Sequence, residues 1–261
     1  VKHTIAVSSA KGGVGKSTCS VNLALALAAQ KKRVGILDAD LFGPSVPKLL
    51  GLAHHKPEVT ADKKMVPLQN FGLKVMSSGF LIPQDKSIIW RGPMVMGAIN
   101  QLLQDTMWGD LDVLVIDFPP GTGDTHLSIT QQLSLSGAVV VSTPQDIALI
   151  DARRGIHMFK QVNVPILGII ENMSYFICTK CDMRHEIFGH GGAEDTALDF
   201  DVPFLGRIPL DGEIRSCSDS GKPVTITNPD GPVAAPYFAI AQTIAARLDA
   251  TETGGPEITF E

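Results

Sequence analysis

The sequence lacks any long hydrophobic run. No apolar stretch approaches the roughly 18 to 20 residues that a membrane-spanning helix requires, and no signal-peptide pattern opens the chain. Positive charge is not in excess either, because the net charge is -5 and the isoelectric point is near 5.8. Without a basic face, binding to nucleic acid is not expected. We therefore expect neither membrane insertion nor a nucleic-acid partner.

Cysteine is scarce, with four residues in 261, which argues against a disulfide framework and favours a reducing compartment. Cys19 and Cys217 stand alone in the sequence and are expected to be small packing residues. Cys178 and Cys181 instead have the C-x-x-C spacing that can chelate one metal centre. Two thiols fill only half of a tetrahedral zinc site, or half of the thiolate set of a four-iron cluster.

Three arrangements could use this cysteine pair. His185 and His190 could complete a zinc site within one chain, although the first histidine follows the second cysteine closely. Alternatively, a two-fold axis could let each of two subunits give two thiolates to one bridging cluster. A thioredoxin-like dithiol is the third possibility, and it is disfavoured because the pair does not open an obvious helix whose dipole would lower a thiol pKa.

The most specific motif spans residues 10–18, Ala-Lys-Gly-Gly-Val-Gly-Lys-Ser-Thr. It follows an apolar run and precedes an alanine-leucine helix pattern, and this order of strand, loop and helix predicts a phosphate-binding loop. The general pattern G-x-x-x-x-G-K-[ST] is broken at its first position by Ala10, whose methyl group is tolerable where φ is negative.

The residue types in this loop match the needs of a triphosphate. Glycines without Cβ atoms let backbone N–H groups wrap the phosphates, Lys16 can reach the β- and γ-phosphates, and Ser17 can offer its hydroxyl to Mg²⁺. The helix that begins there adds its N-terminal dipole. The predicted nucleotide-binding residues of the loop are Gly12, Gly13, Val14, Gly15, Lys16, Ser17 and Thr18.

Strand-length and helix-length patterns alternate along the chain. This alternation predicts a doubly wound, mostly parallel sheet with helices on both faces, in one α/β domain over residues 1–249. Strands are predicted at Ile5–Val7, Val34–Leu37, Leu73–Met76, Val113–Ile116, Ala138–Val141, Ile166–Ile170 and Phe204–Leu205, and helices at Val21–Gln30, Met94–Gln104, Ile147–Val162, Ala193–Asp199 and Ala234–Leu248. Residues 52–70 are predicted to be a surface excursion, and we expect residues 250–261 to form a disordered tail.

Aspartates follow two of the predicted strands. Asp38 and Asp40 come after one strand, and Asp117 comes after another and is followed by Phe-Pro-Pro-Gly-Thr-Gly-Asp. Ligands bind at the carboxyl ends of parallel strands, so these carboxylates are placed to bind Mg²⁺-linked water or to orient an attacking water. An apolar strand that ends in Asp117 predicts a Walker B element supporting Mg²⁺. Helix capping and turn chemistry could instead account for one of the first two aspartates.

The sequence Lys-Gly-Gly-x-Gly-Lys-Ser-Thr resembles the deviant Walker A motif of the MinD, ParA and nitrogenase-iron-protein group. The resemblance implies that Lys11 reaches across a homodimer to the partner's nucleotide, and that Asp40 is the switch I residue that positions the hydrolytic water and supports Mg²⁺. It also implies that Asn172 hydrogen-bonds adenine. ATP is favoured over GTP mainly by this resemblance. In addition, the sequence contains no guanine-binding Asn-Lys-x-Asp element at the corresponding place.

Together with the C-x-x-C pair, these motifs are similar to those of the Mrp/ApbC family of iron-sulfur cluster carrier ATPases. The signatures lie at residues 11–18, 38–47, 90–93, 117–124, 142–151, 172–181 and 208–215. Many bacterial members carry an additional N-terminal domain that this sequence does not contain. The resemblance is therefore strongest to the mitochondrial type, a complex I assembly factor, and the expected compartment is the mitochondrial matrix, with the bacterial cytoplasm as alternative.

The resulting hypothesis is a homodimeric, slow ATPase that uses ATP and Mg²⁺. It would hold a bridging four-iron, four-sulfur (4Fe-4S) cluster on Cys178 and Cys181 of both subunits and pass it to recipient apoproteins, with respiratory complex I subunits as candidates. Two alternatives remain open: a metal-free positioning ATPase of the MinD/ParA type, and an ATPase with a structural zinc site.

Overall fold

The computed structural model describes residues 1–81 and 92–253 of the chain. Trp90 and Arg91, which belong to one of the family signatures, lie outside the described residues. The strands are β1 (His3–Ser8), β2 (Val34–Asp38), β3 (Leu68–Asn70), β4 (Leu73–Ser77), β5 (Val113–Asp117), β6 (Gly137–Ser142), β7 (Ile166–Glu171), β8 (Phe176–Ile177), β9 (Arg184–His185) and β10 (Phe204–Arg207).

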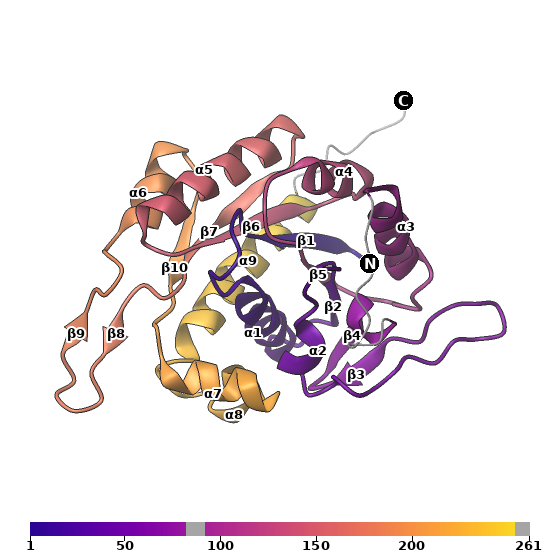
Figure 1. Cartoon of the computed structure of the whole chain (residues 1–261), viewed down its shortest axis with the longest axis horizontal. Coiled ribbons are helices and arrows are strands. Elements are labelled where there is room, and N and C mark those ends of the chain that lie inside the picture. The colour runs from indigo at the N-terminus through magenta and orange to yellow at the C-terminus, as the bar shows by residue number, and fades with distance from the viewer. Residues whose placement is uncertain (82–91, 254–261) are drawn as a thin grey trace.

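The α-helices alternate with these strands, as Figure 1 shows. They are α1 (Lys16–Ala29), α2 (Val46–Leu49), α3 (Gly92–Gln104), α4 (Asp124–Gln132), α5 (Asp146–Gln161), α6 (Gly192–Asp199), α7 (Gly212–Ser220), α8 (Val224–Thr227) and α9 (Ala235–Thr253). A short 3-10 helix covers Ser78–Phe80. No helix in the described part of the chain is long and apolar enough to cross a bilayer.

The main sheet has eight strands in the order β10-β7-β6-β1-β5-β2-β4-β3. All neighbours pair in parallel except the edge hairpin of β3 and β4, which is antiparallel. The central strands β2, β5 and β6 are buried along their whole length, which explains their continuous apolar sequences. The predicted doubly wound, mostly parallel fold is therefore confirmed.

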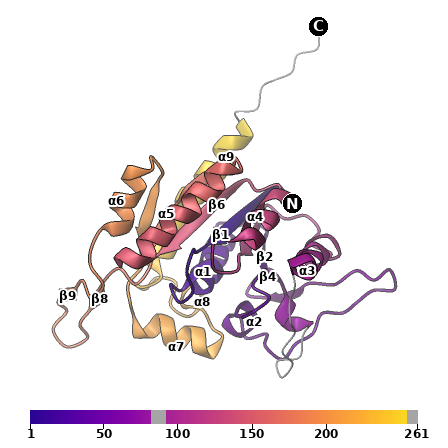
Figure 2. The ribbon, with the colours of Figure 1, turned by 45° about the horizontal axis from the view of Figure 1, so that its top comes forward.

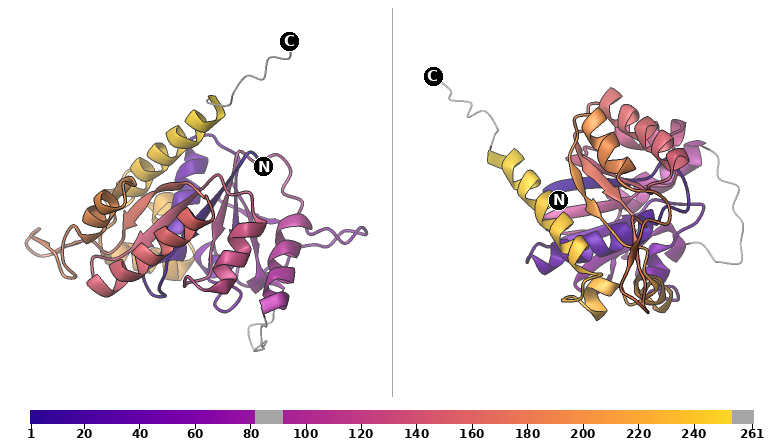
Figure 3. Two further views of the ribbon diagram at one scale, coloured as in Figure 1. Left: turned by 90° about the horizontal axis from the view of Figure 1, so that it is seen from above. Right: turned by 90° about the vertical axis from the view of Figure 1, so that its left-hand side faces the viewer.

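Helices cover both faces of this sheet. Helices α1 and α9 lie together on one face, whereas α3, α4, α5 and α6 lie on the other (Figures 2 and 3). The core fills the two spaces between sheet and helices, and its largest fully buried side chains include Tyr237, Phe118 and Phe159. This layered packing holds the carboxyl ends of the central strands in one row, where the loops that follow them can form a site.

Each of the predicted strands and longer helices is present, with differences at their ends, whereas the short strands β3, β8 and β9 and the helices α4 and α7 were not predicted. Residues 52–70 were expected to be a surface excursion, but they end in strand β3 at the sheet edge. The last helix was expected to stop at Leu248, with a disordered tail from residue 250. Instead α9 continues through Thr253, because no glycine or proline interrupts the helix before residue 254. The rest of the expected tail, residues 254–261, lies outside the described residues.

Candidate functional site

The site is built where three adjacent strands end at the same edge of the sheet. Strand β5 lies between β1 and β2, and its last residue, Asp117, is in register with Val7 of β1 and Asp38 of β2. The loop that follows β1 runs from this edge into helix α1. The register therefore brings the phosphate-loop motif and both acidic motifs of the sequence together.

The phosphate-binding loop has the backbone that its glycines predict. Gly13 and Gly15 have φ values of +87° and +80°, a left-handed conformation that favours glycine. A Cβ atom on Gly15 would also clash with the side-chain amide of Asn172, so the surroundings favour glycine here as well. Ala10 is not among the residues with positive φ, which explains why a methyl group is accepted where the general motif has glycine.

Lys16 and Asp117 form a buried ion pair at the base of this loop. Their Nζ and Oδ1 atoms are 2.7 Å apart, and the side chains are only 6% and 0% exposed. Two hydroxyls complete the shell of the carboxylate: Ser17 Oγ donates to Oδ2 at 2.6 Å, and Ser20 Oγ donates to Oδ1 at 2.5 Å. Such complete pairing is what allows charged groups to be buried.

Two of the residues predicted to hold Mg²⁺, Ser17 and Asp117, are in direct contact. Ser17 and Asp117 present oxygen atoms within 2.6 Å of each other at the start of α1, and oxygen ligands are those that Mg²⁺ prefers. This pair therefore fits a magnesium ion. For Asp40, the predicted contact with Mg²⁺ stays a prediction. The Oδ1 atom of Asp40 accepts hydrogen bonds from the N–H groups of Phe42 and Gly43, and the residue lines a cavity of about 530 Å³ with Pro119 and Pro120.

Asp38 caps helix α2. Its carboxylate is fully buried and accepts hydrogen bonds from the backbone of Ser45 and Val46 at the start of α2, and from the Ser77 hydroxyl. Burial, with a smaller contribution from the nearby charge of Asp117, raises the pKa of this carboxyl to about 7. Capping or turn chemistry was expected for one of the two aspartates, but it is present at both, because Asp40 accepts the turn hydrogen bonds of Phe42 and Gly43. The structure shows that the buried one caps α2.

His126 is a site residue that sequence analysis missed. It lies in the first turn of α4, lines the same cavity as Asp40, and its Nε2 is 3.3 Å from Ser8 Oγ at the end of β1. Burial, and then the positive charge of Lys16, lowers its pKa to about 4, so the imidazole is neutral near pH 7. No local sequence signal marks it, because only the fold brings α4 over β1.

Asn172 contacts the phosphate loop directly. Its Nδ2 donates to the carbonyl oxygen of Val14 at 2.8 Å, and the residue is buried. Beside it, a cavity of about 410 Å³ is lined by the loop and by residues that follow β6 and β7. Its lining comprises Lys11, Gly12, Gly13, Val14, Thr143, Gln145, Ile147, Ala148, Met173 and Phe188. The predicted contact of Asn172 with adenine stays a prediction, and the structure adds a loop-bracing contact that the sequence did not indicate.

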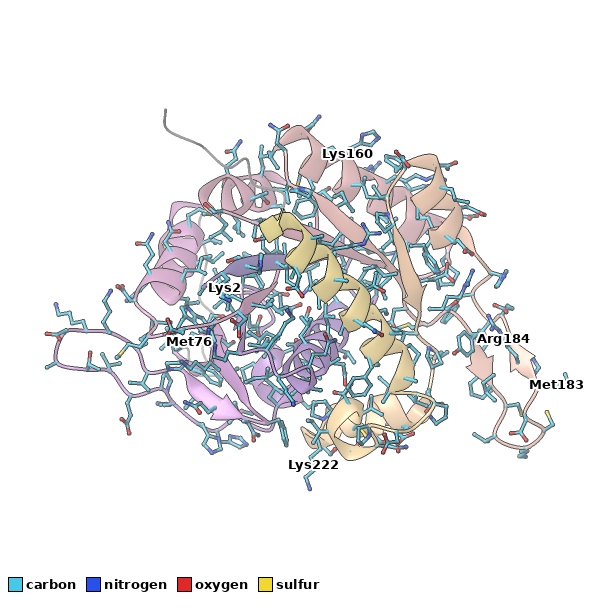
Figure 4. All side chains as sticks on the ribbon, turned by 180° about the vertical axis from the view of Figure 1, so that it is seen from behind. Lys2, Met76, Lys160, Met183, Arg184 and Lys222 are labelled. Atoms are coloured by element: carbon cyan, nitrogen blue, oxygen red, sulfur yellow. The ribbon has the colours of Figure 1, made fainter. Side chains whose placement is uncertain are left out.

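Cys178 and Cys181 lie in the turn of the hairpin formed by β8 and β9, at the outer end of the molecule. Figure 4 shows Met183 and Arg184 on this hairpin, away from the main sheet. The turn is closed by two backbone hydrogen bonds between Cys178 and residues Asp182 and Met183, each 2.9 Å long. As expected from the sequence, the pair does not open a helix.

The environment of the two thiols suits ligation of a metal centre. Cys181 is exposed and Cys178 is half-buried, and neither forms a disulfide. Backbone N–H groups of Lys180 and Cys181 that point at the Cys178 sulfur lower its thiol pKa, which favours the thiolate. Within residues 1–81 and 92–253, no three His, Cys, Asp or Glu side chains gather in a metal-binding cluster. His190 instead contacts Glu186, with Nδ1 and Oε2 3.1 Å apart.

Several known proteins are similar to this chain in sequence. It is 55% identical over 250 residues to the "Iron-sulfur cluster transfer protein NUBPL" of Dictyostelium discoideum, covering 95% of this chain and 77% of the relative. It is 51% identical over 249 residues to the "Iron-sulfur protein required for NADH dehydrogenase, mitochondrial" of Arabidopsis thaliana, covering 95% and 79%. It is also 51% identical over 248 residues to the "Iron-sulfur cluster carrier protein" of Escherichia coli K12, covering 95% and 67%.

A solved structure is also similar to this chain. The nucleotide-binding protein of Archaeoglobus fulgidus in complex with ADP matches this structure with a TM-score of 0.77 at 40% identity, covering 90% of this chain and 91% of that one. The family model described as "ParA: NUBPL iron-transfer P-loop NTPase" matches residues 1–245. The resemblance proposed from the motifs is thus confirmed, and the chain belongs to the ParA/NUBPL family of iron-transfer P-loop NTPases.

Proposed function

We propose that this protein is an ATP-dependent iron-sulfur cluster carrier. In this proposal it holds a 4Fe-4S cluster between two copies of the chain and passes the cluster to recipient apoproteins. The observation that carries the proposal is the hairpin between β8 and β9. It places two accessible thiols, one of them with a lowered pKa, on a projecting turn of a P-loop NTPase. The names of the relatives, which are cluster carrier and transfer proteins, point to the same cargo.

The proposed binding of ATP is supported by the phosphate loop and by its Lys16–Asp117 ion pair. Gly12, Gly13 and Gly15 leave the loop backbone free to surround phosphates, and Lys16 supplies the charge that the β- and γ-phosphates require. Mg²⁺ would be held by Ser17 and Asp117 and, when bound, would neutralise charge on the phosphates. Thr18 would add its backbone N–H at the start of α1.

Asp40 and Lys11 are proposed to act in hydrolysis. Asp40 is half-buried and lines the cavity that faces the Pro119-Pro120 turn, which suits a carboxylate that orients a water. Lys11 is exposed at the rim of the other cavity, where a partner subunit's nucleotide could be reached. Hydrolysis is expected to be slow, because a switch depends on which nucleotide is bound more than on flux.

Binding of the 4Fe-4S cluster requires two copies of the chain. One chain offers two thiols where a 4Fe-4S cluster takes four, and no nearby side chains in the described residues complete the set. A two-fold axis would supply the missing pair, and each thiol would release its proton on ligation. Transfer would then be an exchange of these thiolates for those of the recipient, without a net redox change.

The recipients and the compartment are proposed from the relatives. The Arabidopsis thaliana relative is named for NADH dehydrogenase and as mitochondrial, which supports respiratory complex I subunits as recipients and the mitochondrial matrix as location. The bacterial relative keeps the cytoplasm of a bacterium as the alternative.

Anaerobic reconstitution with iron and sulfide tests the cargo. About four irons per two chains are expected, and Cys178→Ala and Cys181→Ala should each abolish stable cluster binding. Cys19→Ala and Cys217→Ala are matched controls, because both cysteines are buried away from the hairpin, and they should retain the cluster. One zinc per chain, bound by the monomer and lost in His185→Ala, would refute the carrier and support a structural zinc site.

A further inference from the structure

The two ends of the cysteine-bearing segment meet at one buried carboxylate, that of Glu171. Strand β7 ends at Glu171, and the segment is bounded by Ser174, just after this strand, and by Ala193, in the first turn of α6. Ser174 Oγ donates to Glu171 Oε1 at 2.6 Å, and the backbone N–H of Ala193 donates to Glu171 Oε2 at 2.9 Å. Glu171 is the last residue of β7 and is 0% exposed. One side chain in the rigid sheet therefore holds both ends of residues 175–192.

Strand β10 supports this carboxylate from the other side. Arg207 Nε lies 3.7 Å from Glu171 Oε1, and the same guanidinium pairs with Glu194 on α6. Backbone hydrogen bonds from Ser174 N–H to Ile208 and from Leu210 N–H to Tyr175, of 2.9 and 2.7 Å, attach the exit of the segment to the chain after β10. The base of the hairpin is thus fixed to the sheet, whereas its cysteine turn is exposed.

The residues that follow Glu171 contact the phosphate loop. Asn172 donates to the Val14 carbonyl at 2.8 Å, and Met173 packs beside Gly15, with its Cε 3.6 Å from the position a Cβ on that glycine would take. Met173 has a positive φ of 53°, a conformation that is uncommon outside glycine and that turns the chain from the loop toward Ser174. The loop contact and the hairpin clamp are therefore on adjacent residues of one chain segment.

The cavity of about 410 Å³ beside the phosphate loop also connects this loop to the returning arm of the hairpin. Phe188, which follows β9, lines it together with Met173 and the loop residues Lys11 to Val14. A change in the loop backbone would accordingly act on the cysteine segment at two places: through Asn172 and Glu171 at its base, and through Phe188 on its returning arm.

We propose that Glu171 is a positioning residue that couples the phosphate loop to the cysteine hairpin. Nucleotide binding that shifts the Val14–Gly15 backbone would move Asn172. Asn172 follows Glu171 in the chain. The shift would therefore reorient the Glu171 carboxylate, which fixes both ends of the hairpin. The orientation of Cys178 and Cys181 would thus depend on the nucleotide. This inference rests on the proposed function, since it assumes that the loop binds ATP and that the hairpin bears the cluster.

The first test measures backbone hydrogen exchange of residues 175–190 in the cluster-free, 261-residue chain, with and without saturating Mg²⁺-ADP or a slowly hydrolysed ATP analogue. In the unmodified chain, nucleotide should change exchange in this segment by about fivefold or more, the lower end of ordinary coupling between sites. Glu171→Gln, whose amide nitrogen cannot accept a hydrogen bond, and Ser174→Ala should reduce the nucleotide effect to about twofold or less.

Glu194→Gln is the matched control. It neutralises a carboxylate that pairs with the same Arg207, but the hydrogen bonds of Ser174 and Ala193 go to Glu171 and not to the Glu194 side chain, so the nucleotide response should persist. A purely structural role for Glu171 would raise exchange of the segment equally with and without nucleotide and leave its nucleotide dependence intact. That result, in Glu171→Gln or, if that variant does not fold, in Ser174→Ala alone, would overturn the proposal.

The second test measures the half-time of cluster loss to a chelator in the reconstituted dimer, with and without nucleotide. The same variants should lose the nucleotide dependence of this half-time. If the unmodified chain binds the cluster but nucleotide does not change hydrogen exchange in the hairpin, the coupling is refuted and the carrier function stands. If exchange responds to nucleotide through Glu171 but no cluster binds, the coupling is supported and the carrier function fails.

Discussion

Replacement of Lys16 by alanine should remove nucleotide binding and also destabilise the protein. The lysine is 6% exposed and its Nζ lies 2.7 Å from Oδ1 of a carboxylate that is 0% exposed. Lys16→Ala would leave the Asp117 carboxylate buried without its positive partner. Removing one member of a buried ion pair typically costs about 3 to 5 kcal/mol of unfolding free energy. Because Ser17 and Ser20 still donate to the carboxylate, we expect the lower end, about 3 kcal/mol.

A double variant separates the two roles of this lysine. Lys16→Met with Asp117→Asn removes both charges while keeping similar volumes, and neutral replacements of buried pairs are often tolerated. We expect the double variant to regain at least about half of the lost stability. ATP turnover should not return, because the charge on the phosphates is still missing. Lys11→Ala is the control from the same loop: its side chain is exposed, so its stability should stay within about 0.5 kcal/mol of the unmodified chain, while formation of an ATP-bound dimer should be impaired.

Urea unfolding followed by circular dichroism, with ATP turnover measured on the same samples, provides both quantities. A loss of about 3 kcal/mol corresponds to a fall in melting temperature of about 6 to 12 °C for a chain of this size. The reasoning is refuted if Lys16→Ala unfolds within about 0.5 kcal/mol of the unmodified chain, or if the double variant is less stable than the single one. Unchanged ATP turnover in Lys16→Ala would refute the phosphate-loop assignment itself.

Three further predictions follow from particular side chains. The pKa of Asp38 is raised from 3.8 to about 7 in the folded protein, so the folded state binds the proton more tightly and stability should fall as pH rises from about 4 to 7, by up to about 4 kcal/mol. Asp38→Asn should flatten that part of the pH profile, and an unchanged profile would contradict the shift. Iodoacetamide should label Cys178 quickly in the native protein but Cys19 only after unfolding, because burial raises the pKa of the Cys19 thiol to about 12; equal native rates, measured by mass spectrometry, would exclude this difference. Asp40→Asn should keep the two turn hydrogen bonds through its remaining carbonyl oxygen, so ATP turnover should fall by about 100-fold or more with little change in unfolding, whereas full turnover would remove Asp40 from the hydrolytic role.

The sequence by itself determined seven strands of the main sheet, the phosphate loop and the position of the acidic residues along the chain. Strands such as β5 are apolar throughout because both faces are buried, and this pattern is visible without a structure. Gly13 and Gly15 mark left-handed backbone that other residues rarely adopt, so the loop could be located from its glycines. The thiol pair was equally visible, because its chelating spacing is local.

Contacts between distant segments were decided only by the tertiary structure. Ser20 completes the shell of Asp117 across 97 positions of sequence, and His126 reaches Ser8 across 118. Glu171 carried the same signal as Asp38 and Asp117, an acid at the end of an apolar strand, but nothing local distinguishes a carboxylate that clamps a hairpin from one beside a phosphate. Which donors surround each acid depends on strand order and register, and these are set by the packing of the whole sheet.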